Sequence, residues 1–528
     1  GARKHDAFVR GGLGPTSRFR LGLAAIAAAA AALRLYGIGR QSLWFDEALE
    51  YGRAASTLTT ALRGRAIDQD PPALALFYHG WLGLGDSEAW LRLPSAVLGV
   101  VAVVLVVLWS RRVIGPRGAL VAGVLAALSP VLVHYSQEMN QYSAMVFVAL
   151  LLIIAFEKLL RSGGDSDWIL FTALSVFALA LHFGLGFLLA AAWLYMLRRV
   201  WRSGPGHDAL AGGAPSAEAM ARQRQWLLRY TVTISLSLAA LWLLGLGEGM
   251  AVPHLDRRLG GTHLEKEFDY ITDVGWREIL VFDLLPFSGG PMLNGVRVLS
   301  LMAAAGAISL WRSGAAGRRA VGLYFFLPLA LTYAASLMGW YPLGFRYGLF
   351  TVPALFVGLA AGVESLWRRR GAAGSAALVA SAALLLAGST HFDVSNDWLW
   401  VPREELRPVL EHLAGAAAAT DVVYVYYGAV PAYGYYGRDL NARTVVGRHP
   451  GDADAEDEAA RVAHELRQAA ASGSGAHPRL WVVLSHVDGD EGEELLAAFR
   501  AILLAGRAPV DAGAFAADNA SAHLLAWP

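Results

Sequence analysis

Long apolar runs separated by basic clusters constrain the fold of this chain more than any other feature. Runs of about 16–20 apolar residues recur throughout the first 390 positions, and a helix needs about 20 such residues to cross a bilayer. Because unpaired backbone polar groups are not tolerated in lipid, these runs must be helical. Only 16% of the 528 residues are charged, against roughly 25% in average soluble proteins. The sequence therefore predicts a polytopic α-helical membrane protein.

The apolar runs predict about eleven transmembrane helices. Arg18 and Arg20 precede the first run, and each later basic cluster between runs falls on the same side of the membrane as these arginines. Since positive residues favour the cytoplasmic side, the tail 1–19 is expected inside and the first loop outside. No small-residue cleavage site follows the first run, which is expected to be a retained helix. The expected spans are 21–35, 91–109, 119–133, 145–160, 168–181, 184–197, 226–246, 293–311, 321–338, 349–367 and 373–390.

The domain organisation follows from this pattern. A transmembrane domain, 20–390, has long outer loops at 37–90 and 247–291. The character of the sequence changes after this domain, and 391–528 is expected to be an extracytoplasmic α/β domain. The runs at 421–427 and 479–486 are typical of strands, whereas 456–471 and 491–504 have the period of amphipathic helices.

Composition excludes several classes of function. The chain has no cysteine, so it has neither disulfides nor thiolate chemistry. A net charge of +1 argues against a nucleic-acid-binding protein, which usually has a basic face. No glycine-rich fingerprint for a nucleotide is present, so neither a nucleotide nor an organic cofactor is expected.

The segment after the first apolar run contains two adjacent carboxylates, Asp46 and Glu47, at the start of a predicted helix. Charge close to hydrocarbon is unfavourable unless it is paired or hydrated, so these acids are candidate catalytic residues. Asp46 could accept the proton of an attacking hydroxyl. The alternative is an interfacial amphipathic helix whose acids only face water.

Three further polar elements are expected on the same outer face. Asp68 and Asp70 have a spacing that could hold a hard divalent cation such as Mg²⁺ or Mn²⁺, with Asp46 as a further ligand, although they could also simply solvate a loop. The loop 134–143 is the second element. Arg346 is the third, and its fixed fork of donors suits a phosphate. Such a boundary site suits a lipid-linked substrate, whose tail stays in the bilayer.

Several short motifs occur in one order: SLWFDE at 42–47, DPP at 70–72, RLPS at 92–95, SP at 129–130, YSQE at 135–138, and Arg346-Tyr347. This series, over residues 20–390, resembles the GT-C membrane glycosyltransferases of the protein O-mannosyltransferase and lipid A aminoarabinose transferase superfamily. The resemblance implies that Asp46, with Glu47 beside it, is catalytic. It also implies a group near the donor phosphate: Arg346, Tyr347, His134, Gln137, Glu138, Asn140 and Tyr142.

The chain departs from the family pattern at two positions. Asn140 stands where the second loop commonly has an arginine, which leaves phosphate neutralisation to Arg346, a histidine or a metal. Asp70 stands where aminoarabinose transferases have a lysine, which counts against that reaction.

The resemblance implies a glycosyltransferase that moves a hexosyl or pentosyl group from a polyprenyl-phosphate donor to a protein, lipid or polysaccharide acceptor at the outer face of a bacterial-type plasma membrane. A ligase or polymerase of lipid-linked glycans is an alternative, as is a transporter, although no internal repeat is seen. In a third alternative, a receptor, the membrane part would only anchor the terminal domain.

Overall fold

The computed structural model describes residues 15–63, 70–202, 217–246, 291–338, 340–341, 345–369, 404–437, 440–448, 479–486, 510–517 and 520–526, with a few isolated positions between 371 and 468. The chain forms two compact units. The first contains Gly1–Tyr36, Gln69–Leu74 and Leu93–Leu399, and the second contains Gly37–Asp68, Ala75–Arg92 and Trp400–Pro528. The second unit thus joins most of the first loop to the C-terminal part of the chain.

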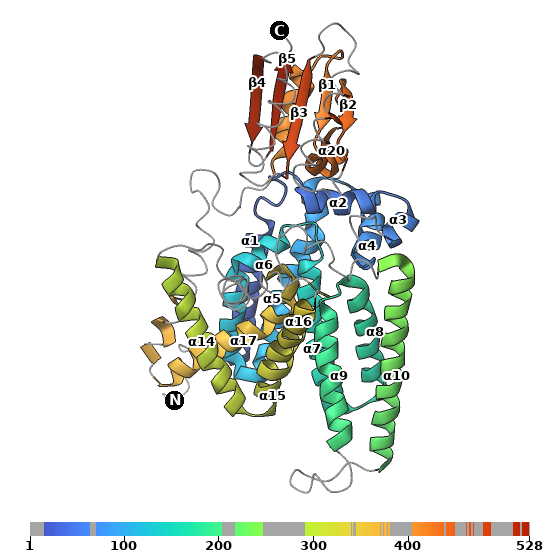
Figure 1. Cartoon of the computed structure of the whole chain (residues 1–528). Helices are drawn as coiled ribbons and strands as arrows, with labels where there is room; N and C mark the ends of the chain where they lie inside the picture. Colours follow the sequence, from blue (N-terminus) through green and yellow to red (C-terminus); the bar gives the residue numbers. More distant parts are fainter. Residues whose placement is uncertain are drawn as a thin grey trace, which may run out of the picture. The chain divides into compact units, whose positions relative to one another are not determined.

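The first unit is helical (Figure 1). Its helices in chain order are α1 (Pro15–Leu35), α5 (Glu88–Leu128), α6 (Pro130–Ser136), α7 (Tyr142–Ser162), α8 (Asp165–Leu181), α9 (Leu185–Arg202), α10 (Ala217–Leu241), η2 (Trp242–Leu246), α14 (Pro291–Ser313), α15 (Ala315–Arg318), η6 (Arg319–Phe326), α16 (Leu327–Leu337), η7 (Phe345–Thr351) and α17 (Val352–Arg369).

Five helical segments of the described residues are long and apolar enough to cross a membrane: Glu88–Leu128, Tyr142–Ser162, Met220–Leu244, Ala315–Leu337 and Arg346–Arg369. They indicate a multi-pass membrane protein. Helices also occupy four other expected spans, in α1, α8, α9 and α14. The last expected span, 373–390, lies largely outside the described residues. The count of eleven stays a prediction.

Helix α5 contains two of the expected spans. Its residue Gly115 has φ +82, which is non-helical, and Pro116 follows directly. A glycine tolerates this backbone conformation without steric cost, so the chain turns here between two helical segments. The second segment ends earlier than expected, because Ser129 has φ −62 and ψ 118 and Pro130 starts the separate helix α6. The Ser129 side chain caps α6 by accepting a hydrogen bond from the Leu132 N–H.

Helices α14 and α17 cross where glycines allow their backbones to touch. A Cβ on Gly306 would collide with the Gly358 carbonyl oxygen, and one on Gly362 would collide with the Met302 carbonyl oxygen. Gly358 and Gly362 are four residues apart, the spacing that brings membrane helices close.

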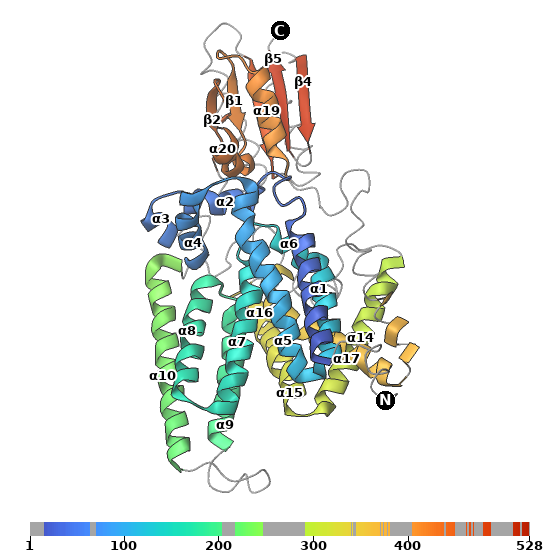
Figure 2. The same cartoon turned by 180° about the vertical axis from the view of Figure 1, so that it is seen from behind.

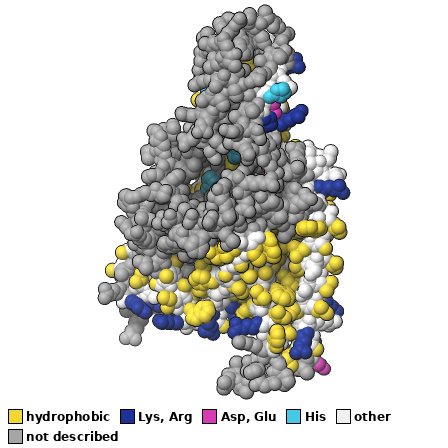
Figure 3. Space-filling model, in the orientation of Figure 1, with side chains coloured by type: hydrophobic (Ala, Val, Ile, Leu, Met, Phe, Trp, Pro, Cys, Tyr) yellow, Lys and Arg dark blue, Asp and Glu magenta, His cyan; other side chains and the backbone are white. Residues whose placement is uncertain are grey.

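Exposed apolar side chains of the helical unit form a band in the space-filling view, and Lys and Arg side chains gather along one edge of this band (Figure 3). Exposed members of the helical unit include Ile169, Leu170, Phe177, Leu228, Leu236 and Trp242. The helix ends carry the basic side chains: the last turn of α17 has Arg368 and Arg369, and that of α14 has Arg312. An apolar belt with a basic margin is what a bilayer-embedded unit requires.

The second unit contains α2 (Phe45–Ala54), α3 (Leu58–Arg63), α4 (Ala73–Trp81) and η1 (Leu82–Leu84), mostly built from the first loop. The predicted helix start with early acids is observed, because α2 has Asp46 and Glu47 in its first turn. Acids at this end are favoured by the helix dipole. Trp81 and Trp90 stack with their ring centroids 4.5 Å apart.

The rest of the second unit is a five-stranded sheet with the order β2-β1-β3-β5-β4. Strands β2, β1 and β3 are parallel, whereas β5 and β4 continue the sheet in antiparallel fashion. Helix α19 (Leu406–Ala416) lies against one face (Figure 2). The strands are β1 (Val422–Val425), β2 (Arg443–Val446), β3 (Leu480–Ser485), β4 (Val510–Ala517) and β5 (Ala520–Ala526), with η8 (Tyr427–Ala429) and α20 (Val430–Tyr436) after β1.

The two strand runs predicted from sequence correspond to β1 and β3. Strands β2, β4 and β5 and helix α19 had no counterpart among the predicted elements. The predicted helices at 456–471 and 491–504 lie almost wholly outside the described residues, as does the outer loop 247–291.

Candidate functional site

Asp46 lies in the first turn of α2, half-buried, in the second unit. Its neighbour Glu47 is wholly buried and paired with an arginine. The Arg92 guanidinium donates from Nε to Glu47 Oε1 at 2.8 Å and from Nη2 to Oε2 at 2.6 Å. Both carboxylate oxygens are therefore engaged by one bidentate partner.

Arg92 also anchors the segment that leads into α2. Its remaining donors reach the carbonyl oxygens of Ile38 at 3.1 Å, Gln41 at 2.9 Å and Ser42 at 2.8 Å. A buried pair of this kind strongly destabilises a protein when one partner is removed. The geometry gives Glu47 a structural role and leaves Asp46 as the acid of this pair that is not sealed in the interior.

The first unit assembles a second cluster, around Arg346. The Arg346 guanidinium carbon lies 5.3 Å from the ring centroid of Tyr347 and 6.0 Å from that of Tyr142, and Nη2 donates to the Tyr347 hydroxyl at 3.3 Å. Arg346 and Tyr347, which are adjacent in the chain, are thus brought together with the distant Tyr142. The sequence assigned all three residues to the donor phosphate. Helix α7 begins at Tyr142, and η7 carries Arg346 and Tyr347 just before α17.

His182, in the turn between α8 and α9, belongs to the same cluster. Its ring lies 6.2 Å from that of Tyr142 and 6.4 Å from that of Tyr347. The Gly184 N–H donates to His182 Nδ1 at 3.0 Å, so a neutral imidazole carries its proton on Nε2. Burial lowers the pKa of His182 to about 4, with Asp70 opposing this shift and Arg346 adding to it.

Tyr341 also belongs to the Arg346 cluster and lies beside the turn that carries His182. A Cβ on Gly184 would collide with the Tyr341 hydroxyl, so Tyr341 packs closely against this turn. Burial raises the pKa of Tyr341 well above its usual value, and the neighbouring Tyr347 and Asp70 add to the shift. Tyr341 and His182 are therefore neutral at physiological pH. The cluster thus combines the Arg346 cation with neutral donors, and the Asp70 carboxylate lies near enough for its charge to act on His182 and Tyr341.

The predicted phosphate ligands in the loop 134–142 differ in what they contact. Gln137 Nε2 donates to the carbonyl oxygens of Leu33, Arg34 and Tyr36, at 3.2, 3.3 and 2.8 Å, and so caps the C-terminus of α1. Asn140 Oδ1 accepts from the Gln141 N–H at 2.6 Å, next to the start of α7.

The remaining two residues of this loop pair with each other. His134 Nε2 lies 3.3 Å from Glu138 Oε1, and Glu138 is buried whereas His134 is 34% exposed. Only Tyr142 of the predicted loop residues has a ring within the Arg346 cluster.

The proposed metal ligands are described only in part. Asp68 lies outside the described residues. Asp70 is exposed, and its Oδ2 accepts a hydrogen bond from Gln141 Nε2 at 3.0 Å. Across the part of the chain that the structure describes, no three His, Asp or Glu side chains come together as metal ligands would. Asp70 remains a suitable hard-oxygen ligand, but the described residues supply only one carboxylate here.

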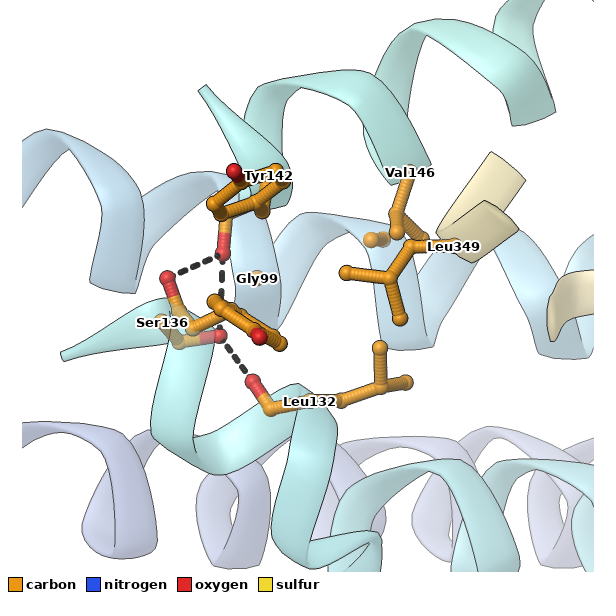
Figure 4. A pocket seen from close by; sticks show the side chains of 9 residues that line it. Gly99, Leu132, Ser136, Tyr142, Val146 and Leu349 are labelled. Atoms are coloured by element: carbon orange, nitrogen blue, oxygen red, sulfur yellow. Dashed lines mark hydrogen bonds between the residues drawn. The ribbon is translucent and has the colours of Figure 1, made fainter. Parts of the chain in front are cut away.

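A small cavity lies behind Tyr142 (Figure 4). It has a volume of about 10 Å³, and its lining includes Gly99, Leu132, Ser136, Tyr142, Val146 and Leu349. Ser143 Oγ donates to the Tyr135 carbonyl at 3.1 Å and lies 3.2 Å from Ser136 Oγ. This volume holds at most about one water molecule, so the cavity is not a sugar site.

Sequence reasoning missed His182 and Tyr341 as members of the Arg346 cluster, and Gln141 as a hydrogen-bond partner of Asp70. Gln141 sat within the motif already singled out, one residue from Asn140. His182 was visible as the one titratable residue in the break between two apolar runs, but a lone histidine carries no signal until its neighbours are known.

Comparisons with known proteins give a family match over part of the chain. Residues 69–205 match the family model described as dolichyl-phosphate-mannose-protein mannosyltransferase. This segment contains Asp70, the loop 134–142 and His182. A search of curated protein sequences gives no match.

Among solved structures, the chain is similar to ArnT from Cupriavidus metallidurans in the apo state. The match covers 95% of this chain and 97% of that one, with 12% identity and a TM-score of 0.54. Arabinofuranosyltransferase AftD from Mycobacteria matches over 96% of this chain and 41% of that one, with 17% identity and a TM-score of 0.47. The Saccharomyces cerevisiae Pmt1–Pmt2 complex matches over 43% and 33%, with 18% identity and a TM-score of 0.35, so this chain spans about a third of that one.

Proposed function

We propose, from the confirmed resemblance to GT-C membrane glycosyltransferases, that this chain transfers a sugar from a polyprenyl-phosphate donor to an acceptor, with Asp46 as the general base. The family match and the ArnT-like fold support a glycosyltransferase. The observation that carries the donor assignment is the convergence of Arg346, Tyr142, Tyr347 and His182 at one end of α7 and α17.

This cluster suits a phosphate at the boundary between lipid and water. Arg346 supplies a permanent positive charge and several donors. His182, held neutral by burial, can donate from Nε2 without adding a second positive charge. The aromatic rings limit the access of water and so strengthen these interactions. Charge develops on the departing phosphate, so donors fixed in advance at this position should stabilise the transition state.

In the proposed reaction, the acceptor hydroxyl attacks the anomeric carbon of the donor. Its proton passes to the Asp46 carboxylate, and the bond between the anomeric carbon and the phosphate oxygen breaks. The bonding electron pair leaves with the polyprenyl phosphate, whose charge Arg346 and His182 stabilise. The reaction is a single displacement.

The membrane orientation of the site is part of the proposal. The basic ends of α14 and α17 support the assignment of one margin of the helical unit to the cytoplasm. Helix α17 starts directly after η7, which carries Arg346, and ends in Arg368 and Arg369. This order supports the proposal that Arg346 lies at the extracytoplasmic end. We propose about eleven spans, a cytoplasmic N-terminus and an extracytoplasmic C-terminal domain in a bacterial-type plasma membrane.

A divalent cation at Asp68 and Asp70 is a second, separable part of the proposal. Such an ion would add positive charge near the phosphate, and Asp70 Oδ1 is a suitable oxygen ligand. A fall in turnover with EDTA that Mn²⁺ reverses, and that is absent in Asp70→Asn, would establish this site. Unchanged turnover in EDTA would remove the metal from the proposal.

The test of the function is transfer from defined donors. Purified chain in detergent or nanodiscs is incubated with polyprenyl-phosphate hexoses and pentoses and with peptide, lipid and glycan acceptors. We expect release of polyprenyl phosphate with one donor class, and a loss of about 10²–10³ in rate in Arg346→Gln. The matched control is Arg368→Gln, at the other end of the same helix and 73% exposed, which should be near wild type. Transport of an intact lipid-linked sugar without release of polyprenyl phosphate would contradict the proposal.

A further inference from the structure

Helix α2, which carries Asp46, does not cap its own N-terminus. Trp44 stands at the cap position with an extended backbone, and its side chain makes no capping hydrogen bond. The first N–H groups of a helix have no partner within the helix and need an acceptor from elsewhere. Here the acceptor comes from a residue 359 positions later, because the Phe45 N–H donates to Glu404 Oε2 at 2.9 Å.

The segment just before α2 is held in the same way. The Ser42 N–H lies 3.2 Å from both carboxylate oxygens of Glu405, and the Ser42 hydroxyl donates to Glu405 Oε2 at 2.8 Å. The Leu43 N–H donates to the Tyr436 hydroxyl at 2.7 Å. Three backbone N–H groups immediately upstream of Asp46 are thus fixed by side chains from the C-terminal part of the chain.

Glu404 also connects α2 to the end of strand β3. Its Oε1 lies 2.6 Å from His486 Nδ1, and the His486 ring stacks on Phe45 with centroids 4.2 Å apart and planes 13° apart. His486 has φ +56, an uncommon backbone conformation for a residue with a side chain. Phe45, Glu404 and His486 therefore form a closed ring of contacts across three chain segments.

We propose that Glu404 and His486 are positioning residues for Asp46, so that the C-terminal part of the second unit sets the catalytic geometry. This inference rests on the proposed role of Asp46. Asp46 directly follows Phe45, so the direction of its side chain depends on where the first turn of α2 starts. A displacement of about 1 Å at a reacting group can lower a rate about 10²-fold.

Substitutions at Glu404 test the positioning role through the kinetic parameters. We expect Glu404→Ala to lower kcat at least tenfold with the donor KM within twofold of wild type, because donor binding belongs to the Arg346 cluster. Glu404→Gln keeps an oxygen that can accept from the Phe45 N–H and should recover most of the loss. His486→Ala should lower kcat less than Glu404→Ala. The control is Glu411→Ala, an exposed acid on α19.

Amide hydrogen exchange gives a readout that does not depend on activity. In Glu404→Ala, exchange in a peptide that covers residues 42–50 should accelerate at least tenfold, whereas Glu411→Ala should leave it unchanged. Unchanged exchange in Glu404→Ala would overturn the inference. Should Glu404→Ala not fold, His486→Ala takes its place: exchange in residues 42–50 should accelerate, though less than expected for Glu404→Ala, and unchanged exchange would overturn the inference.

The outcomes also separate this inference from the proposed function. Faster exchange in Glu404→Ala with unchanged kcat, while Asp46→Asn is inactive, would overturn the positioning role alone. Full turnover in Asp46→Asn would overturn the catalytic role of Asp46, and the positioning inference would fall with it. Faster exchange together with a lower kcat at constant KM supports both.

Discussion

The functional side chains of the Arg346 cluster and of the start of α2 are held in position by different means. In the first unit, Arg346, Tyr142 and His182 lie at helix ends and turns, and each reaches the cluster from its own element. In the second unit, Asp46 depends on acceptors from residues 404, 405 and 436 to hold its helix. The difference teaches that motifs can reveal residues proposed to bind the donor, such as Arg346 and Tyr142. The residues proposed to orient Asp46 lie in a distant part of the chain and carry no motif.

The largest expected effect concerns Asp46. Asp46→Asn should lower kcat about 10²–10⁴-fold, because the amide cannot accept the acceptor's proton. Transfer kinetics with saturating donor measure this loss, and Asp86→Asn, an exposed acid of the same unit, is the control. Near-full turnover in Asp46→Asn would show that Asp46 is not the general base.

The adjacent acid should behave in the opposite way. Glu47→Ala leaves the Arg92 guanidinium buried without its carboxylate and should destabilise the second unit by about 3–5 kcal/mol. Thermal unfolding in detergent should therefore show a clearly lower Tm. The activity per folded molecule, measured well below that Tm, should fall far less than in Asp46→Asn. A stable but inactive Glu47 variant would show that both acids take part in the chemistry.

Two substitutions at His182 test whether its Nε2 takes part in donor binding by the Arg346 cluster. Gln can place its amide N–H near the position of Nε2, whereas Asn reaches only the position of Nδ1. A hydrogen bond to a charged group contributes about 1.5–3 kcal/mol, so His182→Asn should weaken donor binding about 10–100-fold and His182→Gln much less. Binding of a donor analogue measures this, and equal affinities in both variants would contradict the Nε2 assignment.

The smallest effect is a pH dependence of stability. His182 has a folded-state pKa of about 4, below its usual value of 6.5, so the unfolded chain binds a proton more readily. Above pH 6.5 this group has no effect on stability. As the pH falls from about 6.5 towards 4, stability is lost. The Tm of wild type should fall more steeply over this range than that of His182→Gln, and parallel curves would show that His182 titrates normally.

Local sequence signals predicted part of the fold and the site well. Acids before an aromatic-rich amphipathic stretch indicated the start of α2, and β-branched and aromatic runs indicated β1 and β3. Strands β4 and β5 are rich in alanine, a poor strand former, so the pattern did not reveal them. The sequence did predict two separate segments, 91–109 and 119–133, but it did not identify Gly115 as the point of separation, because that depends on its φ of +82.

The same limit applies to individual site residues. Arg346, Tyr347 and Tyr142 could be predicted as a group, since each sits beside an apolar run in a motif. The capping role of Gln137 could not, because it depends on carbonyl groups of α1 about a hundred residues earlier. Glu404 and Glu405 likewise lack any local signal, since their partners lie more than 350 residues away.

The glycine crossing of α14 and α17 has a consequence for the donor cluster. Arg346 lies in η7, which continues directly into α17. Gly358 lies roughly three turns further along this helical segment. A bulkier side chain at Gly306 would push α17 away from α14 and so displace η7, at the start of the same helical segment. Close packing at Gly306 is therefore expected to help set the position of Arg346, and with it the proposed contact with the donor phosphate.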